Sequence, residues 1–219
     1  MNDSAVPKFI NVLEHSRAGH LDEISPEETR RDLEVVRRYL ETELAIEHMD
    51  RPEGEKRRSL AVTRTVLTAI WESPRMEFDA LERAKGCDLQ LTNKALLVPW
   101  SIEAFDQYRS NGNSAGLIFE HVLPLDAIWA ELQRLFTELD VQEWFVEAER
   151  FLNYNYTVAV LTKPQADMID AAGYRKTGFP EHAFERYAEV MRAAAKGRIK
   201  PSVPNAPLDV KRFVHPGIL

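Results

Sequence analysis

Apolar residues recur at helical spacing along most of this chain. The first such stripe consists of Leu33, Val36, Leu40 and Leu44. Upstream of it, Ser25 is followed by Pro26 and, three residues after the serine, by Glu28. A serine cap with a proline in the first turn and a glutamate at this spacing is a capping box. The pattern therefore predicts a helix from residue 25 to about residue 48.

The same spacing predicts further helices. They cover residues 55–72, 78–84, 101–108, 125–139, 144–152, 162–173 and 181–196. Ser101 is the predicted cap of one of them, and Thr162 with Gln165 forms a second capping box. Gly173 is a suitable residue for the left-handed conformation that ends a helix. Core positions of these patterns include the four tryptophans, Trp71, Trp100, Trp129 and Trp144.

Two other segments, residues 117–122 and 156–161, are rich in strand-forming residues. A two-stranded ribbon alone is marginally stable, so we expect helices to cover it. The apolar residues 96–100 fit either a strand or a buried connector. We therefore predict a mainly α protein (α+β), a helical bundle-like domain with a small two-stranded β ribbon in its second half.

These elements suggest three parts along the chain. A helical N-terminal unit covers residues 1–99, and a strand–helix–strand–helix unit covers residues 100–200. A proline-rich extended tail covers residues 201–219. The boundary between the first two parts falls near residues 86–100, and one continuous core is an equally good interpretation.

The composition changes this picture little. The chain has 219 residues and a formal net charge of −7, as expected for one large or two small soluble domains. An acidic chain argues against a large non-specific surface for nucleic acid, although it leaves room for a local basic groove. Cys87 is the only cysteine, so an intrachain disulfide is excluded and a reducing compartment is favoured. The chain start does not resemble a secretory signal and no long apolar run predicts a membrane span, so we expect a cytoplasmic protein.

The segment 116–124, with the sequence GLIFEHVLP, carries the most distinctive chemistry. Glu120 and His121 stand together inside an apolar run that ends at Pro124. Placing an acid and an imidazole in apolar surroundings costs several kcal/mol unless they are paired, ligated or used. We therefore interpret this pair as the candidate functional site.

The motif Glu120-His121-x-x-Pro124 resembles the first motif of the His-Me finger (HNH) nucleases. In that family an acidic residue and a histidine end the first strand of a strand–strand–helix unit built around one divalent metal. The resemblance covers about residues 116–173. It implies a metal-dependent nuclease that uses Mg²⁺ or Mn²⁺ to hydrolyse phosphodiester bonds of a nucleic acid. Here, two helical patterns separate the two strands, and the family's third histidine is absent.

The resemblance also implies roles for individual residues. His121 would be the general base, because a neutral imidazole can take a proton from water at neutral pH. Glu120 and Asn155 would be the other catalytic residues, with Asn155 orienting the histidine or the substrate. Glu120 and Asp167 would be the metal ligands.

Substrate contacts are expected from basic residues around the helix that follows the second strand. These residues are Lys163, Arg175 and Lys176. Lys163 lies at the helix start, where backbone amides also favour phosphate.

A second interpretation gives the same residues structural roles. Adjacent strand residues point to opposite faces, so Glu120 and His121 need not act together. Asn155 is then a turn or cap residue, Asp167 a solvated helix residue, and the basic loop at Arg175 and Lys176 a solvated surface. Under this reading the chain is a non-catalytic helical protein-interaction module. Its acidic helices and its tail would bind a protein partner.

Overall fold

The computed structural model describes residues 25–47, 62, 65–72, 98–179, 184–199, 208 and 213–214. The predicted helix at 78–84, half of the predicted helix at 55–72 and nearly all of the tail 201–219 lie outside these residues. Most of the predicted boundary region, residues 86–100, falls within the undescribed residues 73–97. The division of the chain at residue 99 therefore stays a prediction.

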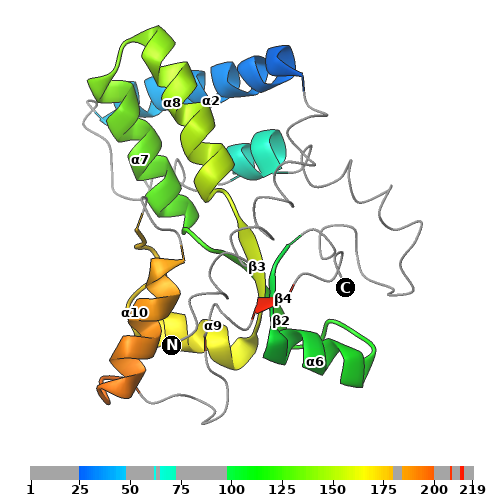
Figure 1. Cartoon of the computed structure of the whole chain (residues 1–219). Helices are drawn as coiled ribbons and strands as arrows, with labels where there is room; N and C mark the ends of the chain where they lie inside the picture. The colour runs from blue at the N-terminus through cyan, green and yellow to red at the C-terminus, as the bar shows by residue number, and fades with distance from the viewer. Residues whose placement is uncertain are drawn as a thin grey trace, which may run out of the picture.

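A four-stranded mixed sheet occupies the middle of the described structure, with strand order β2-β3-β1-β4 (Figure 1). β2 (Leu117–His121) pairs antiparallel with β3 (Val158–Thr162). β1 (Trp100–Ser101) runs parallel to β3, and β4 (Phe213–Val214) pairs antiparallel with β1. The mainly α protein with some β structure is confirmed, but the sheet has four strands instead of the predicted two. β1 and β4 contain two residues each, too few to produce an alternating pattern that a sequence can reveal.

β3 lies inside the sheet and all five of its residues are buried. Val158 and Val160 belong to a small apolar cluster with β1 and α6 (Ile102–Asn111). Ala159 and Leu161 belong to the main core instead. The period of two along a strand thus divides β3 between two apolar layers.

The main core joins the sheet to the helices α2 (Pro26–Glu47), α7 (Leu125–Glu138) and α8 (Val141–Asn155). The short π-helix η1 (Leu67–Glu72) contributes Leu67 and Trp71 to it. The predicted capping box at the start of α2 is confirmed, because Ser25 N–H donates to the carboxylate of Glu28 and Glu28 N–H donates to Ser25 Oγ. All four tryptophans are buried, as predicted.

α9 (Lys163–Ala171) begins directly after β3, and the predicted capping box of Thr162 and Gln165 is present. Gly173 ends the helix with a φ of 84°, in the left-handed region. α10 (Glu185–Ala195) follows and contacts α9. In Figure 1, α9 and α10 lie at the opposite end of the described structure from α2.

The predicted boundaries of α8 and β3 need a correction. α8 continues through Asn155, beyond its predicted end at residue 152, and β3 starts at Val158 instead of residue 156. Asn155 is therefore the last helical residue and does not immediately precede the strand. Among the described helices, none is both long and apolar enough to cross a membrane.

Candidate functional site

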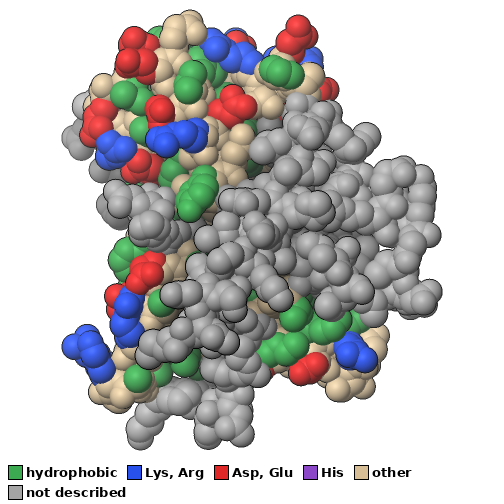
Figure 2. All heavy atoms as spheres, viewed as in Figure 1, with side chains coloured by type: hydrophobic (Ala, Val, Ile, Leu, Met, Phe, Trp, Pro, Cys, Tyr) green, Lys and Arg blue, Asp and Glu red, His purple; other side chains and the backbone are tan. Residues whose placement is uncertain are grey.

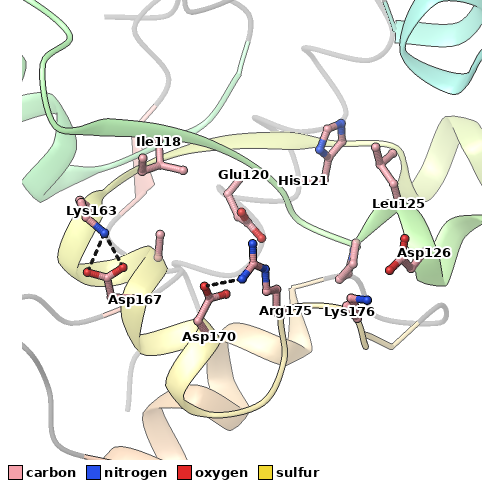
Figure 3. A pocket seen from close by; sticks show the side chains of 12 residues that line it. Ile118, Glu120, His121, Leu125, Asp126, Lys163, Asp167, Asp170, Arg175 and Lys176 are labelled. Atoms are coloured by element: carbon pink, nitrogen blue, oxygen red, sulfur yellow. Dashed lines mark hydrogen bonds and ion pairs between the residues drawn. The ribbon is translucent and has the colours of Figure 1, made fainter. Parts of the chain in front are cut away.

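An open cavity of about 520 Å³ lies between β2, the start of α7, α9 and the segment that follows α9 (Figure 3). Its lining consists of Ile118, Glu120, His121, Pro124, Leu125, Asp126, Lys163, Ala166, Asp167, Asp170, Arg175 and Lys176. Six of the seven side chains predicted for the site line this cavity, and Asn155 does not. Residues from two distant stretches of the sequence, 118–126 and 163–176, therefore meet at one surface.

Backbone contacts hold the cavity walls together. Lys163 N–H donates to the carbonyl of Gly116 at 3.0 Å, which joins the start of α9 to the start of β2. On the other side, Gly178 approaches Leu123 and Pro124 so closely that a Cβ atom at residue 178 would lie 2.4 Å from Leu123 Cδ1. The absence of a side chain at residue 178 thus lets the segment after α9 pack against the end of the GLIFEHVLP motif.

Glu120 is anchored by an arginine from α10. The side chain of Arg186 is fully buried, and it forms an ion pair with the Glu120 carboxylate. Arg186 also donates to the backbone carbonyls of His121 and Tyr174. A guanidinium offers five donors in a fixed planar arrangement, so it can join these three groups at once. The buried arginine connects α10 to the end of β2 and to the segment after α9.

Tyr187, the next residue along α10, is completely buried. Burial raises the pKa of its phenol to about 12, and the Glu120 carboxylate adds to the increase while the Arg186 guanidinium opposes it. Tyr187 is therefore shielded from solvent, and its charged tyrosinate form is disfavoured.

His121 is half-buried at the end of β2. Its Nε2 lies 3.4 Å from the hydroxyl of Tyr156, and the two rings meet edge to face with centroids 5.5 Å apart. Figure 3 shows Glu120 pointing toward Arg175 and Asp170, whereas His121 points to the other side of β2. The two side chains of the motif therefore line the same cavity from different directions.

Asn155 lies away from the cavity, in the last turn of α8. It is buried, and its side-chain amide donates to the carbonyl of Phe151 at 3.2 Å. This bond keeps the amide within its own helix. The predicted role of Asn155 in orienting His121 has no contact to support it.

Three of the four remaining predicted residues form ion pairs with side chains of α9. Lys163 binds both carboxylate oxygens of Asp167, at 2.8 and 3.1 Å. Arg175 lies 3.8 Å from the carboxylate of Asp170 (Figure 3). Lys176 makes no hydrogen bond or ion pair with another described residue. Lys176 is thus the lysine of the cavity that is most available to an added anion.

The charges of the lining nearly cancel. Four carboxylates, Glu120, Asp126, Asp167 and Asp170, face three cations, Lys163, Arg175 and Lys176, for a formal sum of −1. The buried Arg186 behind Glu120 brings the sum to zero. The cavity therefore does not attract a large anion by net charge, and individual side chains must supply any selectivity.

The predicted metal ligands, Glu120 and Asp167, both have cationic partners in the structure. Mg²⁺ and Mn²⁺ favour several oxygen ligands that are free to coordinate. Glu120 is already bound to Arg186, and Asp167 is bound to Lys163. Over the residues that the structure describes, no group of three or more His, Cys, Asp or Glu side chains is placed to hold a metal. The described side chains do not fit a metal centre, and the predicted Mg²⁺ or Mn²⁺ stays a prediction.

Sequence reasoning missed three residues beside the predicted ones: Arg186, Asp126 and Asp170. Arg186 had a detectable signal, because it precedes Tyr187 and lies four residues before Val190 on the apolar stripe of its helix. A charged residue on such a stripe predicts a buried partner of opposite charge. Asp126 and Asp170 lie in ordinary helical segments and offered no comparable signal.

Comparison with protein-family models gave no match, and comparisons with curated proteins and with solved structures gave no significant match either.

Proposed function

We propose that this chain acts on nucleic acid as a phosphodiester hydrolase and that the cavity between β2 and α9 is its active site. The observation that carries the proposal is the meeting of six predicted side chains, from β2 and from the stretch 163–176, around one open cavity. Enzyme sites are typically concave surfaces with a few converging polar groups, which this cavity resembles.

The topology around the cavity supports the same proposal. β2 and β3 pair antiparallel, β3 leads directly into α9, and α9 contacts both strands. This strand–strand–helix order is the arrangement that the resemblance to His-Me finger nucleases implies. The α7–α8 hairpin stands between the two strands as an insertion.

In this proposal His121 accepts a proton from the attacking water. His121 lines the cavity at the end of β2, and its imidazole is half-buried next to the Tyr156 hydroxyl, on the other side of the strand from Glu120. Arg175 and Lys176 would contact the phosphate, because fixed cations stabilise the negative charge that develops during hydrolysis.

Glu120 then has a positioning role. Its carboxylate and the carbonyl of His121 are held by the same buried guanidinium of Arg186. The pair would fix the end of β2 and with it the direction of the His121 side chain. Since Glu120 and Asp167 both have cationic partners, we assign no step of the reaction to a metal.

The test is a cleavage assay on plasmid DNA and on single-stranded RNA, with Mg²⁺, with Mn²⁺ and with EDTA. Loss of a general base typically lowers a rate by about 10²–10⁴-fold, so His121→Gln should lose activity by that factor. Lys176→Ala should weaken substrate binding, whereas Arg31→Ala, an exposed arginine on α2, should act like the wild type. A folded wild type that cleaves neither substrate under any of these conditions would refute the proposal.

A second candidate is the non-catalytic interaction module. It is favoured by a specific observation: Glu120 is bound to a fully buried arginine, as expected of a structural residue, while His121 leaves β2 on the other side. The partner surface would be the acidic α7–α8 hairpin, where Val146 and Tyr154 are 64% and 55% exposed. This candidate predicts a folded, inactive wild type and a partner interaction that Glu143→Lys with Glu147→Lys abolishes.

A further inference from the structure

A second, smaller cavity of about 210 Å³ lies where the end of α9 meets α10. Residues 171, 172 and 174 line one wall, and α10 with the residues after it provides the others. Its charged lining consists of Glu189, Arg192, Lys196 and Arg198. Three cations and one carboxylate give this cavity a formal charge of +2, in a chain whose net charge is −7.

The three cations differ in their ion pairs with carboxylates. Arg192 binds the carboxylates of Glu185 and Glu189. Lys196 and Arg198 are exposed, and neither has a carboxylate partner among the described residues. The end of a helix favours nearby cations, which accounts for Arg192 and Lys196. Arg198 lies beyond the end of α10, so the helix end alone does not explain its position at the same cavity.

The backbone fixes where these side chains start. Gly197 has a φ of 66°, and its N–H donates to the carbonyl of Ala194, while Arg198 N–H donates to the carbonyl of Ala193. This left-handed termination turns the chain back toward α10. Lys196 and Arg198 are thereby held on either side of one glycine at the rim of the cavity.

The second cavity adjoins the first through consecutive residues. Tyr174 lines the second cavity, and Arg175 and Lys176 line the first. Figure 2 shows Lys or Arg side chains on the surface over α10. Five basic side chains thus line the two neighbouring cavities: Arg175 and Lys176 at the first, and Arg192, Lys196 and Arg198 at the second.

We propose that the second cavity binds a phosphate group through Lys196 and Arg198. Lysine supplies a point charge, and arginine supplies a planar donor pair that matches two phosphate oxygens. This site can be extended to a nucleic acid, and that extension rests on the proposed hydrolase function. In that case the second cavity holds one backbone phosphate of the strand, and the scissile bond of the same strand lies at the first cavity. The phosphate site itself does not depend on catalysis.

The experiment compares the wild type with the double variant Lys196→Ala and Arg198→Ala. Calorimetry with inorganic phosphate, and fluorescence anisotropy with a single-stranded DNA 20-mer, measure binding to each source of phosphate. Both side chains are exposed, so the variant should fold, and its circular dichroism melt verifies this. Arg31→Ala on α2 is the matched control.

We expect the wild type to bind phosphate and the double variant to bind it at least about tenfold more weakly, as loss of two charge-assisted contacts implies. For the DNA, the slope of log affinity against log salt should fall by about one to two, since each phosphate contact contributes nearly one. Arg198→Lys should retain part of the binding. Equal phosphate binding by the wild type and the double variant, or none by the wild type, would overturn the site.

The two proposals fail separately. His121→Gln should bind phosphate like the wild type while losing cleavage. Phosphate binding that requires Lys196 and Arg198 in a protein without nuclease activity would support the phosphate site and refute the hydrolase. Phosphate binding without any DNA binding would support the site for free phosphate and refute its extension to a nucleic acid strand.

Discussion

The α7–α8 hairpin and the region after α9 have opposite charge. Residues 125–155 contain seven acidic and two basic side chains, a sum of −5. The described residues from 173 to 199 contain six basic and two acidic side chains, a sum of +4. A net charge of −7 therefore hides a basic surface, and an acidic pI does not exclude a local site for anions.

The two regions also differ in how their charges are used. In the hairpin, Arg134 binds Glu131 and Glu138, and Arg150 binds Glu147. These are exposed pairs within single helices, which contribute little stability each. In the basic region, Arg186 is buried and joins separate elements, whereas Lys196 and Arg198 lack described partners. The buried structural arginine thus lies on α10, and the two cations of the proposed phosphate site follow the end of the same helix.

The largest loss of unfolding free energy is expected when Arg186 is replaced. Arg186→Met leaves the Glu120 carboxylate and the carbonyls of His121 and Tyr174 without their donor. Removing one partner of a buried ion pair costs about 3–5 kcal/mol. Urea unfolding should reveal this loss, and Arg192→Met on the exposed side of α10 should change stability by less than about 1 kcal/mol. Similar values for the two variants would contradict the anchoring role.

A comparable loss of unfolding free energy is expected when Trp144 of the α7–α8 hairpin is replaced, because apolar burial is lost there. Trp144 is 1% exposed and packs against Phe136 and Phe145. Trp144→Ala should cost about 3–5 kcal/mol through lost burial and the cavity left behind. Because this loss is apolar, thermal melts at low and high salt should give the same difference from the wild type. Val146→Ala, at an exposed position of the same helix, is the control.

A smaller loss of stability against unfolding is expected at alkaline pH, through Tyr187 on α10. The pKa of Tyr187 is raised from 10.0 to about 12, so the folded protein holds this proton more tightly than the unfolded chain. Its contribution is complete below pH 10 and is lost as the pH rises toward 12, a loss on the order of 2 kcal/mol. Unfolding between these pH values should show a steeper decline for the wild type than for Tyr187→Phe. Equal slopes would show that Tyr187 is not the responsible group.

The smallest loss of unfolding free energy is expected when the Thr162 cap at the start of α9 is removed. Thr162 Oγ1 accepts from Gln165 N–H, so Thr162→Ala should cost about 1 kcal/mol and Thr162→Ser much less. Thr137→Ala, which removes an exposed hydroxyl on α7, should have a smaller effect. Differential scanning calorimetry measures all three, and a Thr162→Ala protein as stable as the wild type would mean that the cap does not hold α9.

Local signals predicted most of the helices and both longer strands. The capping boxes at Ser25 and Thr162 marked helix starts correctly because their hydrogen bonds span only three residues. On α2, however, Glu43 is buried at the position where Leu44 was expected. Its carboxylate accepts from the indole N–H of Trp129, 86 residues away, and such a distant contact leaves no trace in a local pattern.

The candidate site illustrates the same limit. Glu120 and His121, which the motif singled out, both line the cavity, since strand pairing and the start of α9 bring their surroundings together. The motif did not predict that Glu120 would be bound by Arg186, because these residues are 66 positions apart. Asn155, also predicted for the site, ends the longer α8 and does not line this cavity.

The insertion of the α7–α8 hairpin between paired strands has a consequence for changes in its length. His121 pairs with Val158, and Val122 N–H donates to the carbonyl of Thr157 at 2.7 Å, so the chain leaves and re-enters the sheet at adjacent points. The free energy of closing such a loop grows only slowly with its length. The strands and α9 therefore keep their places if the turn between α7 and α8 changes in length, whereas the inner faces of both helices are fixed by the core that they share with α2.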